Sequence, residues 1–191
     1  VFCWERCVQL KRDAFPAFEE AGVKLLVVGI GSVESGREFA ESLDFPKPLL
    51  LVDESEQTDA YRAAGTRNSG RDEKTGKQVF EGGSSRWSDA TNDAINERGK
   101  EDLDGITGNL FNPGPYKPLM PKGKSLFDMA AIEKTLVQGG SFVFRGEETL
   151  LGHIDQSSGA HLPLQVLMDT ALSALEAEEL PAAAAAAVAT S

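Results

Sequence analysis

Cysteine is the residue type that gives this chain its clearest capacity for covalent chemistry, and both of its cysteines, Cys3 and Cys7, lie near the start. The apolar spacing from Trp4 to Ala21 predicts a helix, with Cys3 at its beginning and Cys7 one turn further in. Backbone N–H groups and the helix dipole at that end stabilise a thiolate, the nucleophilic form of cysteine, and lower its pKa. Two interpretations of Cys3 stay open, a redox thiol and an inert, partly buried one, whereas Cys7 is expected to pack in the interior.

Other groups of reactive residues give weaker indications. His153 and His161 are the only histidines, and their spacing relative to the cysteines matches no zinc-ligand pattern, so no metal site is expected. The Gly29-Ile30-Gly31 segment lacks the third glycine and the acidic partner of a dinucleotide-binding loop. No Ser/His/Asp set with local signatures supports hydrolase chemistry. The sequence therefore predicts no bound cofactor.

The elements that follow the first helix alternate between strands and helices. Residues 23–30 and 49–52 are continuous apolar runs, which predict strands buried on both faces, as in a parallel sheet. Helices are expected over residues 33–43 and 55–64, and Pro16 should kink or divide the first helix. This alternation is typical of an α/β layer fold. A helix that covers a sheet normally follows a strand, and that strand is missing from the sequence given.

Residues 66–124 have a different character, because they are rich in small and polar residues and their apolar residues are isolated. We interpret this segment as a long irregular insertion within a single domain over residues 1–181. It is either a solvated surface loop or an arm that binds a partner, and Trp87 is a feature that favours docking. The alanine-dominated residues 182–191 are expected to form a low-complexity tail.

The C-terminal part predicts a helix over residues 125–136, a hairpin of strands 141–144 and 149–153, and a final helix over residues 163–178. With the missing first strand supplied, the order is β-α-β-α followed by β-β-α. The predicted fold class is therefore α/β, a thioredoxin-like fold in which helices flank a central mixed sheet.

Composition and charge narrow the possible functions. Of 191 residues, 41% are hydrophobic and 26% are charged, which is enough apolar mass for a core. The net charge of -11 argues against a nucleic-acid partner, and no apolar run is long enough to predict a transmembrane segment. Two cysteines cannot form a disulfide framework, so a reducing compartment is expected. The start at Val1 is neither a signal peptide nor an ordinary translation start, so we expect the sequence to be processed or incomplete there.

Several segments, spread over residues 1–65 and 105–175, carry a family resemblance in their order and spacing. They are Cys3-Trp4-Glu5, residues 21–31 (AGVKLLVVGIG), Phe45-Pro46, residues 51–53 (LVD) and 61–65 (YRAAG), Phe111-Asn112-Pro113, residues 138–146 (QGGSFVFRG), Leu150-Leu151, Asp155-Gln156 and Gly159-Ala160-His161. Together they resemble the peroxiredoxin-like 2 proteins of the AhpC/TSA branch of the thioredoxin superfamily. The plant and algal plastid members are the most similar.

The resemblance implies a CxxC pair at the start of the first helix, used for thiol-dependent reduction of a peroxide-type bond. Cys3 corresponds to the second cysteine, and the first would lie immediately before Val1. A second cysteine can resolve a sulfenic acid as a disulfide, and an external dithiol donor of the thioredoxin type would then reduce the protein. Trp4 and Glu5 are expected near the substrate. So is Gly139-Gly140, which takes the place of the thioredoxin cis-proline or is simply a flexible strand entry.

Two functions follow as hypotheses. The first is a peroxiredoxin-like thiol oxidoreductase, an antioxidant enzyme of the chloroplast, with Cys3 in its site and no bound cofactor. The second is a redox-inactive structural subunit of a larger complex, photosynthetic for example, which binds through residues 66–124. The residue before Val1 in the complete gene product would discriminate between them, because a cysteine there favours the enzyme.

Overall fold

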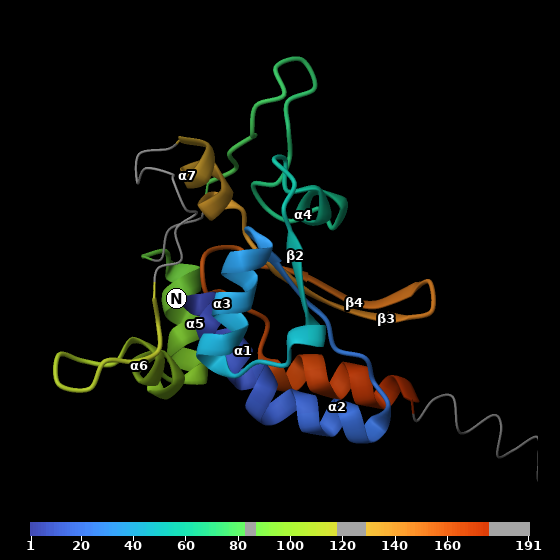
Figure 1. Cartoon of the computed structure of the whole chain (residues 1–191). Coiled ribbons are helices and arrows are strands. Elements are labelled where there is room, and N and C mark those ends of the chain that lie inside the picture. Colours follow the sequence, from blue (N-terminus) through green and yellow to red (C-terminus); the bar gives the residue numbers. More distant parts are fainter. Residues whose placement is uncertain (83–86, 118–128, 176–191) are drawn as a thin grey trace, which may run out of the picture.

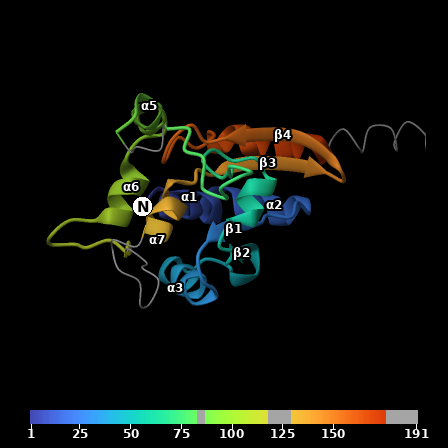
Figure 2. The same cartoon turned by 90° about the horizontal axis from the view of Figure 1, so that it is seen from above.

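The computed structural model describes residues 1–82, 87–117 and 129–175. Its central element is one long N-terminal helical segment, formed by α1 (Phe2–Gln9), the π-helical turn η1 (Leu10–Ala14) and α2 (Phe15–Ala21). Figures 1 and 2 show this segment between two layers, with β1, β2 and α3 on one side and the hairpin and C-terminal helix on the other. The predicted helix over residues 4–21 is therefore present and is the element that the rest of the fold surrounds.

Pro16 produces the irregularity that the sequence predicts in this segment. Proline has no N–H to donate, and its ring collides with the carbonyl group four residues earlier, so a regular α-helix cannot pass through it unchanged. The π-helical turn η1 ends at Ala14, just before Pro16 at the beginning of α2. The wider turn accommodates the proline without ending the segment, which stops at Gly22 in a left-handed conformation (φ 73°).

The first sheet consists of two parallel strands, β1 (Val27–Ile30) and β2 (Leu50–Asp53), with Val27 opposite Leu50. Helix α3 (Val33–Leu43) covers it, and Ser32 caps this helix by accepting a hydrogen bond from the backbone N–H of Ser35. After β2 the chain forms the short helix α4 (Asp59–Ala63), which is a smaller part of residues 55–64 than the pattern predicts.

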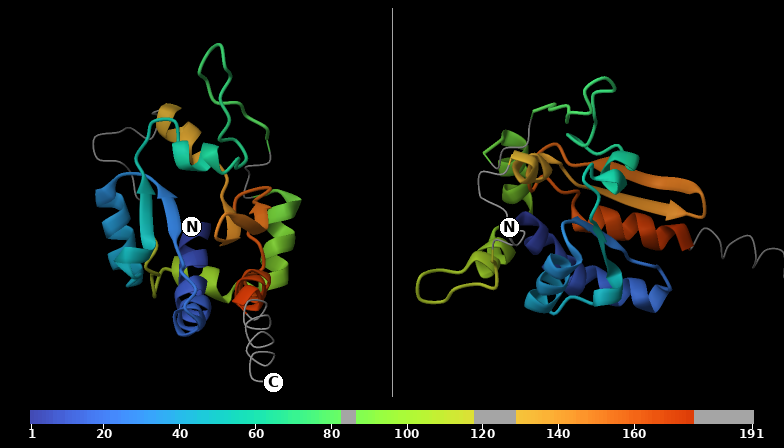
Figure 3. Two further views of the ribbon diagram at one scale, coloured as in Figure 1. Left: turned by 90° about the vertical axis from the view of Figure 1, so that its right-hand side faces the viewer. Right: turned by 45° about the horizontal axis from the view of Figure 1, so that its top comes forward.

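The second sheet is the antiparallel hairpin of β3 (Gly140–Arg145) and β4 (Glu148–Ile154). The expected central sheet is therefore not continuous: the described strands form two separate two-stranded sheets, shown apart in Figure 3. The prediction that the β1 and β2 runs are buried on both faces is also wrong, because Val28 is 40% exposed and Leu51 is 48% exposed. These two side chains lie opposite each other on one face, which no helix covers completely.

The described part of residues 66–124, which is 66–82 and 87–117, contains more helix than its composition predicts. It contains helices α5 (Asp89–Arg98) and α6 (Glu101–Thr107), and α6 packs against α1. The apolar pattern misses α5 because its buried contacts are mostly polar, with Ile95 as its one buried apolar residue. Ser88 provides a helix-start signal, since its hydroxyl caps α5 by accepting from the N–H of Thr91.

Two apolar clusters form the core. The first joins α1 to α3 and α6, and its buried members are Trp4, Cys7, Ala40, Leu43, Phe45 and Ile106. The second joins η1 and α2 to the hairpin and the C-terminal helix, and its buried members are Leu10, Ala14, Phe18, Val143, Leu162, Leu167 and Ala171. The long N-terminal segment thus contributes to both clusters, and Val27 of β1 packs against each of them.

The predicted C-terminal elements are present where the structure describes them. Helix α7 covers Met129–Leu136, and the C-terminal helix covers residues 164–175. The predicted starts and ends of these helices at residues 125–128 and 176–178, and the alanine-rich tail over residues 182–191, lie outside the described residues.

Candidate active site around Cys3

Cys3 is the second residue of α1 and is exposed to solvent. Cys3 is therefore more accessible than the interpretation of an inert, partly buried thiol expects. The surrounding protein nevertheless desolvates the thiol and raises its pKa, and the Asp155 carboxylate raises it further. A backbone hydrogen bond acts in the opposite direction without reversing the result. The expected lowering of the Cys3 pKa at the helix start is therefore wrong.

Cys7 lies one turn further along α1 and is only 3% exposed. Burial raises the pKa of its thiol to about 12, so it remains protonated at neutral pH. It packs within the cluster that includes Trp4, as the sequence predicts. Both cysteines are free in the structure, and Cys3 is the accessible one.

A buried carboxylate, Asp155, lies just after β4 and contacts both histidines. Its side chain is 4% exposed, and its Oδ2 is 2.7 Å from Nδ1 of His161. Its Oδ1 is 3.5 Å from Nε2 of His153, which is too long for a strong hydrogen bond. Burial lowers the pKa of the Arg6 guanidinium, on α1, and the negative charge of Asp155 raises it. We call Arg6, His153, Asp155 and His161 the Asp155 cluster.

The loop after β4, which carries Asp155 and His161, packs against the first turn of α1. Gly159 approaches the Phe2 ring so closely that a Cβ atom there would come within 2.7 Å of it. The Gly159 backbone has a φ of 83°, a conformation that favours glycine. Phe2 immediately precedes Cys3, so this contact attaches the loop to the helical turn that carries the thiol.

The Gly139-Gly140 pair joins α7 to β3 and borders the same carboxylate. The Gly139 carbonyl accepts a hydrogen bond from the Asp155 N–H at 3.0 Å, and a Cβ atom on Gly139 would lie 3.1 Å from Asp155 Oδ2. At Gly140 a Cβ atom would lie 2.6 Å from the His153 carbonyl oxygen. Close packing against β4 thus explains both glycines, and a flexible strand entry is not needed. Their proximity to a substrate remains a prediction.

Trp4 and Glu5 lie in the packed interior. The Trp4 ring makes edge-on contacts with Phe39 and Tyr116, at centroid distances of 5.0 Å and 5.6 Å. Glu5 forms a two-pronged ion pair with Arg98, whose Nε and Nη2 donate at 2.8 Å and 2.9 Å. Both side chains thus pack against other residues of the protein, and their expected proximity to a substrate remains a prediction.

The ion pair of Glu5 belongs to a second polar group, which includes Thr91 and Ser157. The Thr91 hydroxyl donates to the Ser158 carbonyl at 2.7 Å and lies 2.7 Å from the Ser157 hydroxyl. We call Glu5, Thr91, Arg98 and Ser157 the α5 cluster. It attaches the 66–124 segment to α1 and to the loop after β4.

Three residues near Cys3 were not identified from the sequence as site residues: Arg6, Tyr61 and Asp155. Arg6 had a usable signal, because a residue three positions after Cys3 lies on the same side of a helix. The Tyr61 hydroxyl donates to the Val28 carbonyl at 2.7 Å, and its pKa is raised by burial and then by Cys3. No spacing rule connects Asp155 with Cys3, because they meet only through the fold.

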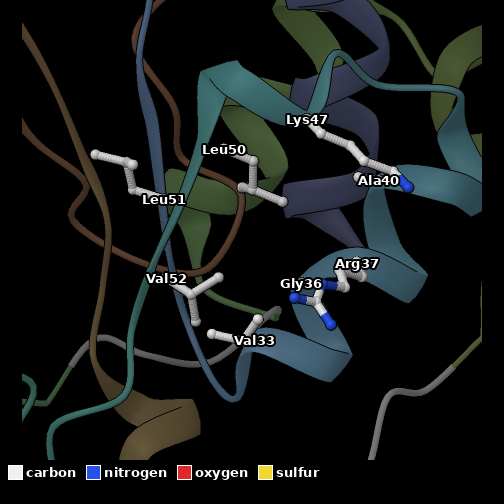
Figure 4. A pocket seen from close by; sticks show the side chains of 8 residues that line it. All are labelled: Val33, Gly36, Arg37, Ala40, Lys47, Leu50, Leu51 and Val52. Atoms are coloured by element: carbon white, nitrogen blue, oxygen red, sulfur yellow. The ribbon is translucent and has the colours of Figure 1, made fainter.

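Two pockets have linings that do not include Cys3. One, of about 400 Å³, lies between α1, α5 and α6, and Val1, Phe2 and Ile95 are among its lining residues. The other, of about 280 Å³, lies between α3 and β2. Figure 4 shows its apolar side chains and its two cations, Arg37 and Lys47. Its lining includes no cysteine, histidine or carboxylate, so the redox-capable groups are elsewhere.

The described residues show neither a metal-binding cluster nor a membrane-spanning helix. No cluster of three or more histidine, cysteine or acidic side chains in this part of the chain could hold a metal ion. Among the helices that the structure describes, none combines the length and apolar character needed to cross a membrane.

The fold and the site define a class: an α/β protein with an accessible cysteine at the start of its first helix. Comparison with known families makes this specific, because the sequence pattern described as "AhpC/TSA antioxidant enzyme" matches residues 9–157, more than three quarters of the chain. The chain therefore belongs to the AhpC/TSA antioxidant enzyme family, which confirms the thioredoxin-like fold class. Asp155 and Gly139-Gly140 lie within the matched residues, and Cys3 precedes them. No curated protein and no solved structure matches the chain.

Proposed function

We propose that this chain is a peroxiredoxin-like thiol oxidoreductase in which Cys3 reduces a peroxide or disulfide substrate. The observation that carries the proposal is the exposure of Cys3 at the first turn of α1 in a member of the AhpC/TSA family. Cys7, by contrast, is buried and protonated and does not compete as the nucleophile. An external dithiol of the thioredoxin type is the proposed electron donor.

The proposed step with a peroxide is a two-electron transfer. The Cys3 thiolate attacks one peroxide oxygen, an S–O bond forms, and the O–O bond breaks with its electron pair on the departing oxygen. The products are a sulfenic acid at Cys3 and, after protonation, water or an alcohol. A second thiol then condenses with the sulfenic acid to form a disulfide and water, and the external dithiol reduces that disulfide.

The pH dependence of this step tests the role of Cys3. Only the thiolate reacts, and the thiol pKa is raised above its ordinary value of 9.0, so the rate of oxidation should still be rising above pH 9. Formation of sulfenic acid by hydrogen peroxide is measured by trapping with dimedone in the wild type, Cys3→Ser and Cys7→Ser. Loss of labelling in Cys3→Ser alone supports the proposal, whereas equal, negligible labelling of all three proteins contradicts it.

The finer parts of the proposal are the compartment and the family branch. The resemblance to plant and algal peroxiredoxin-like 2 proteins supports a plastid location and a CxxC pair whose other cysteine immediately precedes Val1. Chloroplast import of the full gene product, followed by mass analysis of the mature N-terminus, tests both points. Exclusion from chloroplasts would contradict the location, and another residue before Val1 would contradict the pair.

A second candidate is a redox-inactive structural subunit that binds a larger complex through residues 66–124. The observation in its favour is that Leu110 and Phe111, in the loop after α6, are 92% and 94% exposed. Adjacent exposed apolar side chains of this size are typical of contact surfaces.

Deleting the whole segment would be a poor test of this candidate, because it would remove Arg98 and leave Glu5 buried without its partner. The double substitution Leu110→Ser/Phe111→Ser changes only the exposed surface. If this candidate is correct, the variant should migrate alone on size-exclusion chromatography of a plastid extract while the wild type migrates with a complex. Identical migration of the two proteins would argue against it.

A further inference from the structure

The Asp155 cluster has hydrogen-bonding capacity that the protein itself does not use. Four of its buried atoms have no hydrogen-bond partner among the described residues: Arg6 Nη2, His153 Nε2, Asp155 Oδ1 and His161 Nε2. Leaving a buried polar atom unpaired costs about 1–3 kcal/mol, so most such atoms in folded proteins are paired. Four of them around one nearly inaccessible carboxylate indicate a site whose polar groups serve a ligand or a reaction.

The four unpaired atoms include both hydrogen-bond donors and acceptors, which restricts the kinds of ligand that they can bind. The Arg6 guanidinium can only donate, Asp155 Oδ1 can only accept while ionised, and the two imidazole nitrogens can do either. A hydroperoxide matches this set, because each of its oxygens accepts hydrogen bonds and its O–H group donates one. A purely anionic ligand fits less well, because the Asp155 carboxylate would repel it.

His161, the histidine closer to Asp155, is held in an orientation suited to proton transfer. Its Nδ1 lies 2.7 Å from Asp155 Oδ2, a distance at which Nδ1–H donates to the carboxylate. This bond fixes the ring orientation and the tautomer, and it leaves Nε2 able to take up or release a proton. Because the Asp155 side chain is only 4% exposed, water does not weaken this contact.

The cluster and Cys3 share one region of the molecule. The Asp155 charge acts on the Cys3 thiol, and both Cys3 and Asp155 act on Tyr61. Arg6 is on the same helix as Cys3, three residues later, which is about one turn away. The contact of Gly159 with Phe2 holds the loop between Asp155 and His161 against this turn.

We propose that the Asp155 cluster is the proton-transfer site for the reaction of Cys3 with a peroxide. This inference rests on the proposed function. Arg6 binds the peroxide. His161, oriented by Asp155, acts in its imidazolium form, with a proton on each ring nitrogen, and donates the Nε2 proton to the oxygen that leaves when the O–O bond breaks. The Cys3 sulfur gains the other oxygen as a sulfenic acid, the leaving oxygen becomes water or an alcohol, and His161 recovers its proton from solvent.

The test compares oxidants and alkylating agents whose leaving groups differ in their need for a proton. Rates of Cys3 modification at pH 7 are measured for wild type and His161→Gln with hydrogen peroxide, peracetic acid and iodoacetamide. General acid catalysis contributes about 10²–10⁴-fold, so we expect at least a tenfold loss with hydrogen peroxide. With peracetic acid and iodoacetamide the loss should be less than twofold, because acetate and iodide leave without protonation.

Two further variants guard against a merely structural effect. Asp155→Asn keeps the shape of the side chain and should also lose rate selectively with hydrogen peroxide. His153→Gln changes the same residue type at the longer 3.5 Å contact and should lose less than His161→Gln. Equal losses with all three reagents would overturn the inference, and so would a greater loss in His153→Gln than in His161→Gln.

The same experiment separates this inference from the proposed function. If the wild type reacts with iodoacetamide but not with either peroxide, the proposed function fails. If the wild type reacts with hydrogen peroxide and His161→Gln reacts equally fast, the proposed function stands and the proton-transfer site is rejected.

Discussion

The two polar clusters that border α1 differ in one respect, although they begin at adjacent residues. In the α5 cluster, which begins at Glu5, every buried side-chain polar atom has a partner, whereas the Asp155 cluster, which begins at Arg6, contains four without one. A fully paired cluster fixes the position of a segment, and here it attaches α5 to α1. A partly paired cluster sacrifices stability locally, which is a common property of sites that carry out chemistry.

The largest expected effect comes from breaking the paired cluster. Glu5→Gln leaves the Arg98 guanidinium, which is 17% exposed, without a charged partner. Removing one member of a buried ion pair typically costs about 3–5 kcal/mol. We expect a loss of that size in the free energy of unfolding, measured by urea denaturation. A loss below about 1 kcal/mol would show that the pair is not the main attachment of α5.

A similar effect is expected from alkaline pH, through the buried Cys7 thiol. The Cys7 pKa is raised from 9.0 to about 12, so this residue contributes stability below pH 9 that is lost as the pH rises to 12. Three pKa units correspond to on the order of 4 kcal/mol. Urea denaturation from pH 8 to 12 should show this loss in wild type. In Cys7→Ala, which has no thiol at this position, the loss should be smaller by that amount, and the remainder comes from Cys3 and Tyr61, whose pKa values are also raised.

A smaller effect is expected from an uncharged member of the α5 cluster. Thr91→Val keeps the side-chain shape but removes the hydrogen bond to the Ser158 carbonyl and the contact with the Ser157 hydroxyl, each at 2.7 Å. We expect a loss of about 1–3 kcal/mol. Thermal unfolding measures it, with the exposed Thr75→Val as the matched control. A melting temperature equal to that of the control would mean that these bonds add no net stability.

The smallest effect is expected in the Asp155 cluster. Asp155→Asn keeps an acceptor for His161 and removes a buried charge whose Oδ1 has no partner. We expect a change of less than about 1 kcal/mol in either direction, because the desolvation cost of the charge disappears with it. Urea denaturation of Asp155→Asn beside Glu5→Gln measures the contrast directly. If the two variants lose equal free energy of unfolding, the Asp155 cluster and the α5 cluster do not differ in their contribution to stability.

Local patterns in the sequence predicted the parts of the fold that depend on neighbouring residues. The helix stop at Gly22, the Ser32 cap and the hairpin of β3 and β4 each follow from residues within one or two turns. The placement of Cys3 at a helix start and the burial of Cys7 follow in the same way. These features need no knowledge of the rest of the chain.

The errors arise where distant residues decide the outcome. The partner of Glu5 could not be predicted, because Arg98 lies 93 residues away. Helix α5 was missed because its burial depends on polar contacts such as Thr91 with Ser157, which leave no apolar period. The expected acidic thiol at Cys3 was wrong because desolvation and Asp155 outweigh the helix-start effect. None of these contacts leaves a signal in a single sequence.

The π-helical turn η1 has a consequence for how sequence length can vary in this helix. A π-helical turn holds one residue more than an α-helical turn, and one residue corresponds to a rotation of about 100° along an α-helix. If all residues of Leu10–Ala14 were wound as a regular α-helix, Phe18 would turn away from Leu167 while Trp4 kept its place beside Phe39. Deleting one residue from this turn would restore regular winding and keep both halves facing their present neighbours. The turn therefore keeps the two halves of the segment in phase with two different cores.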